Sequence, residues 1–240
     1  MRDRGKLLEI LQEDKDIIVC RKPAGLAVQT ARPGQPDLVS ILKNYRADKQ
    51  EPPYIGVITR LDQPVEGLLV FAKNRQAAAQ LSRQQQSGQW IKEYLAVVCG
   101  IPEKKEGCLT DWLRRDGRRN CSAVVPEQTE GAKRAVLSYR VLGVCREPSG
   151  GLALVRIRLE TGRHHQIRVQ MAHAGYPLYG DRKYGSSGDY PSGTALALCA
   201  ARLTFRHPGT GRETEYRIIP EGQGFTAFSE DLQSCKITGI

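Results

Sequence analysis

Short apolar runs separated by turn residues dominate the chain, and they predict a protein built mainly from strands. Two such runs, YIGVI at 54–58 and LLVF at 68–71, flank a single acidic residue, Asp62. The Gln63-Pro64 and Glu66-Gly67 steps between the runs are typical of turns. We therefore expect Asp62 at the end of a strand, in largely apolar surroundings. A charge there is costly unless a cation or hydrogen-bond donors compensate it. The alternative is an ordinary turn-capping aspartate.

Helical periodicity and capping residues predict three short helices along the chain. They are expected at 37–46 with Asp37 as N-cap, at 74–86 with Asn74 as N-cap, and at 165–174 with a stop at Gly175. Two minor helical segments are expected at 6–12 and 225–232.

Strands alternate with turn residues from 90 to 160, which predicts an antiparallel meander. A surface loop at 184–193 and a strand at 196–206 are expected to follow. The pattern predicts an α+β fold with a large mixed, mostly antiparallel sheet flanked by short helices and loops. We expect a short N-terminal extension, 1–13, and a single domain, 14–240.

Charge and cysteine content narrow the class of protein. Thirty-six Lys and Arg against 26 Asp and Glu give a net charge of +10, which favours a polyanionic partner such as RNA or DNA. Seven cysteines, an odd number without a C-x-x-C pair, argue against a zinc site or a disulfide framework. No apolar run approaches the length of a membrane span. A cytoplasmic protein with reduced thiols and no membrane contact is expected.

A second informative segment, 159–184, reads LETGRHHQIRVQMAHAGYPLYGDRKY. Together with TRLDQPVEGLLVFAK at 59–73, it resembles the RluA family of RNA pseudouridine synthases. Three further stretches fit the family in the same order: DKDIIVCRKPAGLAVQ at 14–29, WIKEYLAVVCG at 90–100, and ALALCAARLTFRHP at 195–208. Any one of these stretches is weak evidence for the family, but five of them in the family's order are specific.

The resemblance implies a pseudouridine synthase fold with a central catalytic cleft and isomerisation of specific uridines in rRNA or tRNA. It implies neither cofactor nor metal, because the reaction needs one carboxylate, a dry pocket and an extruded uridine. The expected partner is an RNA stem-loop, and the expected state is a monomer. Relatives with an added S4-type RNA-binding module carry it at the N-terminal end, where we expect none.

The resemblance also assigns roles to four residues. Asp62 matches the essential carboxylate, and Arg168 matches the arginine that pairs with it and keeps it ionised in a dry pocket. Tyr94 matches the tyrosine that lines the pocket and takes part in proton transfer. Arg60 matches an arginine that enters the RNA stack and holds the flipped base out. The alternatives are an exposed helix arginine, a core tyrosine and a strand-end arginine in water.

Other residues are candidates for contact with RNA. Three of them lie at or just before a predicted helix N-terminus, where phosphate or ribose binds readily: Arg163, His165 and Gln166. Three more belong to the arginine-rich stretch WLRRDGRRN: Arg114, Arg115 and Arg118. That stretch is expected to form a hairpin turn that grips RNA, and a solvated charged turn is the alternative. Leu198, in the 195–208 stretch, is the last substrate-binding candidate.

The sequence departs from the family pattern at several positions near these candidates. Thr59 stands for a His, Val65-Glu66 for Thr-Ser, His164 for a Thr, and Gln170 and Cys199 for His residues. The four positions assigned to catalysis are intact, so the departures bear on substrate choice and pocket shape.

Two other functions compete with RNA isomerisation. An RNA chaperone on the same fold would have weak or lost catalysis, against which the intact catalytic positions argue. A hydrolase with a Ser or Cys nucleophile would need other motifs, and neither a G-x-S-x-G elbow nor a P-loop is present.

Overall fold

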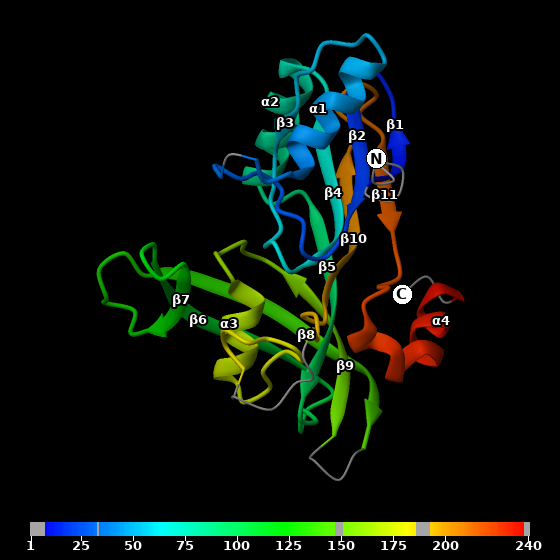
Figure 1. Cartoon of the computed structure of the whole chain (residues 1–240). Coiled ribbons are helices and arrows are strands. Elements are labelled where there is room, and N and C mark those ends of the chain that lie inside the picture. The colour runs from blue at the N-terminus through cyan, green and yellow to red at the C-terminus, as the bar shows by residue number, and fades with distance from the viewer. Residues whose placement is uncertain (1–7, 33, 147–150, 186–192, 238–240) are drawn as a thin grey trace. The chain divides into compact units, whose positions relative to one another are not determined.

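The computed structural model describes residues 8–32, 34–146, 151–185 and 193–237 (Figure 1). These residues contain eleven strands of a large, mostly antiparallel sheet and few helices, which confirms the predicted α+β class. The chain forms two compact units, which we call unit 1 (1–92 and 200–218) and unit 2 (93–199 and 219–240). No helix among the described residues is long and apolar enough to cross a membrane.

Unit 1 contains five neighbouring strands in the order β1-β2-β4-β10-β11, with the short β3 also paired to β4. The strands are β1 (Glu9–Glu13), β2 (Ile17–Lys22), β3 (Gly56–Val57), β4 (Glu66–Ala72), β10 (Leu198–Arg206) and β11 (Glu213–Arg217). Its helices are α1 (Leu38–Asp48) and α2 (Arg75–Gln86). The strands β2 and β4 are buried along their whole length, so the core of the unit surrounds them.

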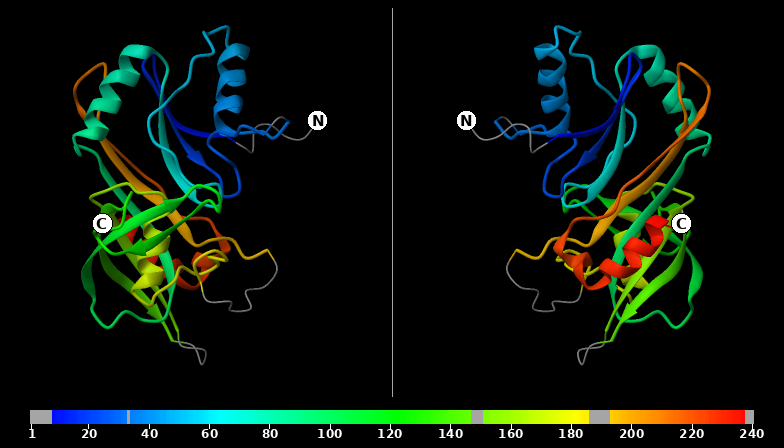
Figure 2. Two further views of the ribbon diagram at one scale, coloured as in Figure 1. Left: turned by 90° about the vertical axis from the view of Figure 1, so that its left-hand side faces the viewer. Right: turned by 90° about the vertical axis from the view of Figure 1, so that its right-hand side faces the viewer.

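The two helices of unit 1 cover opposite faces of its sheet (Figure 2). Because side chains alternate along a strand, Ile17 and Val19 pack with Leu81 of α2. Ile18 and Cys20, which point the other way, pack on the α1 side. A sheet covered on both faces explains why its central strands read as continuous apolar runs.

The predicted helix caps of unit 1 are confirmed. The Asp37 carboxylate accepts a hydrogen bond from the amide of Ser40 at the start of α1 (2.7 Å). The Asn74 side-chain oxygen accepts from the amide of Ala77 at the start of α2 (2.8 Å). Both contacts are local in sequence, and each satisfies an amide that has no partner within its helix.

Two local predictions in unit 1 are wrong. Of the segment expected to form helical turns at 6–12, residues 6 and 7 lie outside the described residues, and 9–12 instead belong to β1, because the buried strand β2 needs a neighbour for its backbone groups. Glu66-Gly67 does not form a turn but begins β4. Gly67 has φ +137°, and a Cβ atom there would lie 2.4 Å from the backbone nitrogen of Ala200. Glycine is thus needed at 67 for the close approach of two strands.

Unit 2 contains five antiparallel strands in the order β5-β9-β8-β6-β7. They are β5 (Ile91–Cys99), β6 (Glu106–Asp116), β7 (Cys121–Val125), β8 (Lys133–Cys145) and β9 (Leu152–Leu159). The antiparallel prediction is confirmed, but the strand order is not that of a meander. In a meander β5 would pair with β6, whereas here β5 pairs with β9, and β8 lies between β9 and β6. The helices of this unit are α3 (Gln166–His173), the 3-10 helix η2 (Gln223–Phe228) and α4 (Ser229–Ile237). The expected loop at 184–193 lies mostly outside the described residues.

The helix α3 packs against β6 and β7 and is buried on more than one face. Ile167 and Met171 are buried as the periodicity predicts, but the polar residues Gln166, Arg168 and Gln170 are buried as well. Their side chains make hydrogen bonds with neighbouring strands and loops, which is the condition for burying polar groups. Apolar periodicity alone therefore describes only part of the packing of α3.

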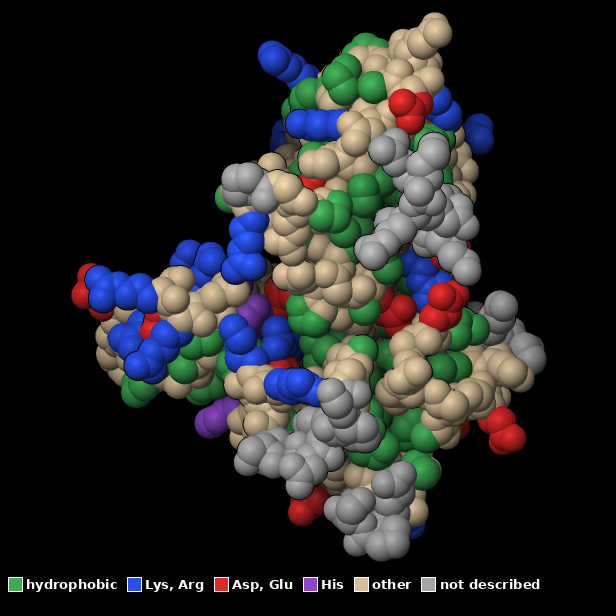
Figure 3. Space-filling model, in the orientation of Figure 1, with side chains coloured by type: hydrophobic (Ala, Val, Ile, Leu, Met, Phe, Trp, Pro, Cys, Tyr) green, Lys and Arg blue, Asp and Glu red, His purple; other side chains and the backbone are tan. Residues whose placement is uncertain are grey.

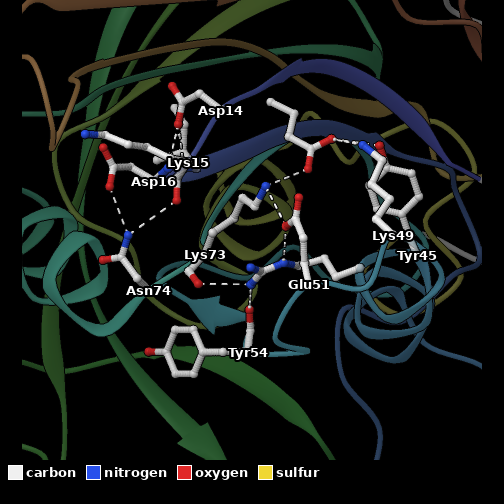
Figure 4. Close-up of polar contacts among 12 residues, drawn as sticks. Asp14, Lys15, Asp16, Tyr45, Lys49, Glu51, Tyr54, Lys73 and Asn74 are labelled. Atoms are coloured by element: carbon white, nitrogen blue, oxygen red, sulfur yellow. Dashed lines mark hydrogen bonds and ion pairs between the residues drawn. The ribbon is translucent and has the colours of Figure 1, made fainter.

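A network of ion pairs ties β1, α1 and the end of β4 together in unit 1 (Figure 4). The buried ammonium of Lys73 contacts Glu13 Oε1 (2.7 Å) and Glu51 Oε2 (2.9 Å). Glu13 also pairs with Lys49 (2.9 Å), and the buried guanidinium of Arg46 donates to Glu51 (3.1 Å). The chain segments that carry these groups are distant in sequence, so the network fixes their arrangement.

We expect this network to make the protein sensitive to acid. Burial raises the pKa of Glu13, but hydrogen bonds from Lys49, Lys73 and Tyr45 outweigh that effect and lower it to about 2. A carboxyl whose pKa falls on folding stabilises the fold above its ordinary pKa of 4.5, and this stability disappears as the pH falls toward 2. The expected loss from this group is about 3 kcal/mol of unfolding free energy.

Urea unfolding of Glu13→Gln between pH 7 and pH 2.5 tests this prediction. The variant should be less stable than the natural chain at pH 7 and should lose less stability on acidification. Substitution of the exposed Glu213 in the same unit, Glu213→Gln, is the control and should leave the acid slope unchanged. An acid slope equal in all three proteins would contradict the role of Glu13.

Candidate active site

Asp62 lies in unit 1, in the segment between β3 and β4, directly before a turn at Gln63 and Pro64. The amide of Val65 donates to the carbonyl oxygen of Asp62 (3.0 Å), which closes this turn against the buried strand β4. Asp62 is half-buried, whereas Arg60, two residues earlier, is exposed. The backbone at Asp62 is thus fixed and the residue is partly shielded from water, two properties that the position of a reacting group needs.

A buried lysine is part of the electrostatic surroundings of Asp62 in unit 1. Lys22, the last residue of β2, is completely buried, and its Nζ donates to the carbonyl oxygen of Gln63 (3.0 Å). The carboxylates of Asp62 and Glu66 both act on the charge of Lys22. In the sequence Lys22 stands out only as part of a Lys-Pro turn, because nothing in the pattern indicates that its ammonium points inward.

The departure from the family pattern at Glu66 has a structural partner. Glu66 is buried, and its Oε2 accepts a hydrogen bond from Nη2 of Arg21, which is also buried (3.1 Å). Arg21 also lies 3.8 Å from Glu9 of the neighbouring strand β1. A buried carboxylate requires such a pairing, and Glu66 is thereby accommodated within unit 1.

Tyr94 lies in β5 of unit 2, opposite Ile157 of β9. It is half-buried, whereas the next four residues of β5 are buried. The first half of β5 is therefore the part that leaves side chains accessible. The role of Tyr94 in a uracil pocket stays a prediction.

Arg168 is buried in unit 2 and forms a two-pronged ion pair with Asp181. Its Nε donates to Asp181 Oδ2 and its Nη2 to Asp181 Oδ1, both at 2.7 Å. Burial raises the pKa of Asp181, but the hydrogen bonds and charge of Arg168 outweigh that effect and hold it below its ordinary value. The alternative of an exposed helix arginine is therefore wrong. Pairing between Arg168 and Asp62 stays a prediction.

The ring of His165 is hydrogen-bonded to Tyr184, which is itself bonded to β7. The amide of Ser122 donates to the Tyr184 hydroxyl oxygen (2.8 Å), and that oxygen lies 2.6 Å from His165 Nδ1. Burial, followed by the charge of Arg168, lowers the pKa of His165 to about 3, so the ring is neutral at physiological pH. The Tyr184 hydroxyl can then donate to Nδ1, in the tautomer that carries its hydrogen on Nε2. In that tautomer His165 is a neutral donor through Nε2.

The neighbouring His164, another departure from the family pattern, contacts the β6–β7 hairpin. Its Nδ1 lies 3.0 Å from Ser122 Oγ, and its Nε2 lies 3.2 Å from Asn120 Oδ1. The rings of His164 and His165 stack with centroids 3.8 Å apart. His165 adopts a left-handed backbone conformation (φ +54°) at the N-cap of α3, so these contacts hold a strained residue in place.

The two remaining candidates near α3 have contacts within unit 2. The Gln166 side chain is buried; its Oε1 accepts from Thr161 Oγ1 (2.8 Å) and from the amide of Arg163 (2.9 Å). Its Nε2 donates to the carbonyl oxygen of Val136 (3.0 Å). Arg163 is exposed, and its Nε donates to the carbonyl oxygen of Arg134 (2.9 Å). Gln166 thus orders the loop before α3, and RNA contact by either residue stays a prediction.

The arginine-rich stretch forms the predicted hairpin between β6 and β7, with Asp116 opposite Cys121. Lys and Arg side chains gather over this hairpin (Figure 3). The three candidate arginines in it are all exposed: Arg114, Arg115 and Arg118. The carboxylate of Asp116 accepts a hydrogen bond from the amide of Arg118 (2.9 Å), and this contact shapes the turn. Leu198, the last candidate, is buried at the start of β10 in unit 2.

The sequence interpretation gave no role to Asp181, which pairs with Arg168, or to Tyr184, which contacts His165. Both belong to the GDRKY stretch of the 159–184 segment, so their positions in a family motif were the available signal. Their roles depend on contacts with α3 and β7, which the sequence does not reveal. Among the described residues, no group of three or more His, Cys, Asp or Glu side chains is placed to hold a metal ion.

Comparison with known proteins gives a consistent result. A family model described as RNA pseudouridylate synthase matches residues 16–173. Ribosomal large subunit pseudouridine synthase D of Vibrio parahaemolyticus is 36% identical over 240 residues, covering 94% of this chain and 71% of the relative. The protein of the same name from Pseudomonas aeruginosa is 38% identical over 89% of this chain and 69% of its own length. An uncharacterised RNA pseudouridine synthase of Bacillus subtilis is 36% identical over 89% of this chain and 70% of its own length.

Solved structures show the same similarity at the level of the fold. Human RNA pseudouridylate synthase domain containing 4 superposes with a TM-score of 0.71 at 25% identity, covering 94% of this chain and 93% of that one. Human RNA pseudouridylate synthase domain containing 1 superposes with a TM-score of 0.75 at 24% identity, covering 95% and 87% of the two chains.

Proposed function

Because the chain belongs to the RluA family of RNA pseudouridine synthases, and is therefore an isomerase that converts RNA uridine to pseudouridine, we propose that it uses Asp62 on a flipped-out uridine of large-subunit ribosomal RNA. The substrate is inferred from the relatives in Vibrio and Pseudomonas, whose names specify the ribosomal large subunit. The observation that carries the proposal is a 36% identity that spans 94% of the chain.

The reaction explains why one carboxylate is central. The bond between C1′ and N1 breaks, a bond between C1′ and C5 forms, C5 loses a proton and N1 gains one. A carboxylate can assist by attack at C1′ or on the uracil ring, and both routes require that Asp62 be ionised. Its place on a turn against a fully buried strand supports this role, because the group needs a fixed position.

The other candidate residues supply binding and charge in this proposal. Arg168 places a buried positive charge that favours an ionised carboxylate, and Tyr94 lines the uracil pocket. Arg60 is exposed, as a residue that inserts into RNA must be. His165 donates through Nε2 to an RNA oxygen acceptor without changing its charge, because its pKa is about 3.

The exposed arginines of the β6–β7 hairpin contribute affinity in this proposal. Guanidinium groups that neutralise phosphates release counterions, so RNA affinity should fall steeply with salt concentration. Hydrogen bonds from His164 to Asn120 and Ser122 connect this hairpin to the loop that carries His165. We further propose that the enzyme is a cytoplasmic monomer that needs no cofactor, and sedimentation with and without RNA tests the monomeric state.

Mapping of pseudouridines in total RNA, with and without the gene, tests the proposed substrate. We expect one or a few sites in large-subunit rRNA to disappear on deletion, and the purified protein to restore them in an unmodified transcript. Loss of sites confined to tRNA would overturn the rRNA assignment. RNA binding without any change in pseudouridine content would favour an RNA chaperone instead.

A further inference from the structure

Arg114 and Arg115 are adjacent in sequence but project to opposite faces of the sheet in unit 2, because side chains alternate along a strand. Arg115 is opposite Ser122 of β7, whose Oγ lies 3.0 Å from His164 Nδ1. Arg115 therefore belongs to the face that carries α3 and the loop before it. Arg114 is opposite Ala123 and belongs to the other face.

The second face, which we call the outer face, is open next to the hairpin. Strand register assigns five residues of β6, β7 and β8 to this part of it: Thr110, Trp112, Arg114, Ala123 and Arg134. The helix α3 packs on the opposite side, where Leu113, Ala135 and Val169 form a buried cluster. Four of the five outer-face residues are exposed, and Trp112 is half-buried. The described parts of the chain thus leave this region of the sheet accessible.

The outer face combines positive charge with an aromatic ring. Trp112 is directly opposite Arg134 of β8, and Arg114 follows two residues later on β6, about 7 Å along the strand. The five residues include two cations and no acid. The acid of the hairpin turn, Asp116, accepts a hydrogen bond from the amide of Arg118 (2.9 Å). An indole between two guanidinium groups is thereby presented on an accessible surface.

This combination fits single-stranded RNA. Guanidinium groups bind phosphates, and indole rings stack on unpaired bases. A duplex keeps its bases stacked inside, so its faces are not accessible to Trp112. A second copy of this chain fits the surface poorly, because the same cations would then face each other.

The position of the outer face allows one RNA strand to contact both sides of the hairpin. The strand β7 is the last in the sheet order, so it forms an edge of the sheet. Arg118 and Arg119 are exposed in the turn that joins β6 to β7. Exposed arginines therefore lie on the α3 side (Arg115), at the turn, and on the outer face (Arg114). An RNA strand can follow them around this edge.

We propose that the outer face binds a single-stranded segment of the substrate RNA, with a base stacked on Trp112 and phosphates on Arg114 and Arg134. The inference rests on the proposed function, to which it adds a second RNA-contact surface. It implies that the enzyme binds an RNA with a single-stranded flank more tightly than the bare stem-loop.

Fluorescence of the folded protein tests the stacking contact. The probe is an oligoadenylate of about 12 nucleotides, a length within the range of single-strand binding sites. It contains no uridine, so its binding does not depend on the proposed reaction. The natural chain should lose tryptophan fluorescence when the probe is added. Trp112→Phe, which retains the buried Trp90, should show no such loss. Equal quenching in the two proteins would overturn the stacking contact.

Affinity for the same probe tests the cations. Arg114→Gln/Arg134→Gln should bind it about tenfold more weakly at low salt, and the slope of log affinity against log salt should become shallower by about 1.4. Trp112→Leu should weaken binding by about fivefold or more and leave this slope unchanged. The matched control is Arg75→Gln/Arg83→Gln, which removes two exposed arginines from α2 in unit 1 and should bind within about twofold of the natural chain.

Equal affinity and equal salt dependence of the outer-face and control variants would overturn the proposal. A change of oligomeric state in sedimentation, with oligoadenylate affinity unchanged, would also overturn it and assign the face to a second copy. Single-turnover kinetics on a large-subunit rRNA fragment then give the consequence for the enzyme. The outer-face variants should raise the concentration for half-maximal rate and leave the maximal rate unchanged. Because the oligoadenylate measurements need no turnover, they separate failure of this inference from failure of the proposed function.

Discussion

Asp62→Asn should abolish pseudouridine formation while leaving RNA affinity within about tenfold of the natural enzyme. The amide keeps the size and hydrogen-bonding capacity of the side chain but has no negative charge and is a poor nucleophile. Affinity should persist because it derives mainly from contacts between cationic side chains and phosphates, such as those offered by the hairpin arginines. The rate is measured under single-turnover conditions, and affinity by filter binding at fixed salt concentration.

The control for this experiment is Asp48→Asn, which removes an exposed carboxylate at the end of α1 in the same unit. It should retain full activity. Turnover by Asp62→Asn near the natural rate would remove Asp62 from the mechanism. A parallel loss of RNA affinity by more than about a hundredfold would instead indicate that Asp62 maintains the binding surface.

Arg168→Met should disable the enzyme and also destabilise it by about 3–5 kcal/mol. The structural reason is the buried carboxylate of Asp181, which would lose both 2.7 Å hydrogen bonds and its compensating charge. The unfolding free energy is measured in urea, and the activity at matched folded fraction. Arg158→Met, which removes an exposed arginine from β9, is the control and should change neither quantity substantially.

A double-mutant cycle separates the structural role of Arg168 from its catalytic role. Asp181→Asn should also be destabilising, and the double variant should be less unstable than the sum of the two single changes, because each removes the same pair. Activity of Arg168→Met that is restored fully at matched folded fraction would show that the arginine acts through stability alone. A Met variant as stable as the natural chain would contradict the buried pair itself.

The parts of the fold that the sequence predicts well are those set by neighbouring residues. Asp37 and Asn74 bond to amides three positions later, so their roles as caps follow from local chemistry. The place of β9 between β5 and β8 follows from pairing between distant segments, and no local pattern specifies it. Gly67 was wrongly assigned to a turn for the same reason. Glycine is needed there because Ala200, 133 positions later, approaches closely, and the local sequence does not show this contact.

The candidate site divides in the same way. The family motif draws attention to Asp62 and Arg168 because both lie in recognisable stretches. The inward orientation of Lys22 and the use of Gln166 to order a loop depend on carbonyl groups that carry no side-chain signal. Backbone acceptors are common to all residues, so a sequence pattern cannot indicate which ones a buried polar side chain will contact.

The discontinuity of unit 1 affects how the protein is made. Its strand β4 emerges from the ribosome early, but its neighbour β10 (Leu198–Arg206) begins only at the end of the segment 93–199. At 5–20 residues per second, that segment takes roughly 5–20 s to synthesise. During this interval one side of β4, with its apolar side chains, has no native partner strand. Nascent chains at this stage should bind chaperones that recognise extended apolar segments, and should be released once residue 218 has left the exit tunnel.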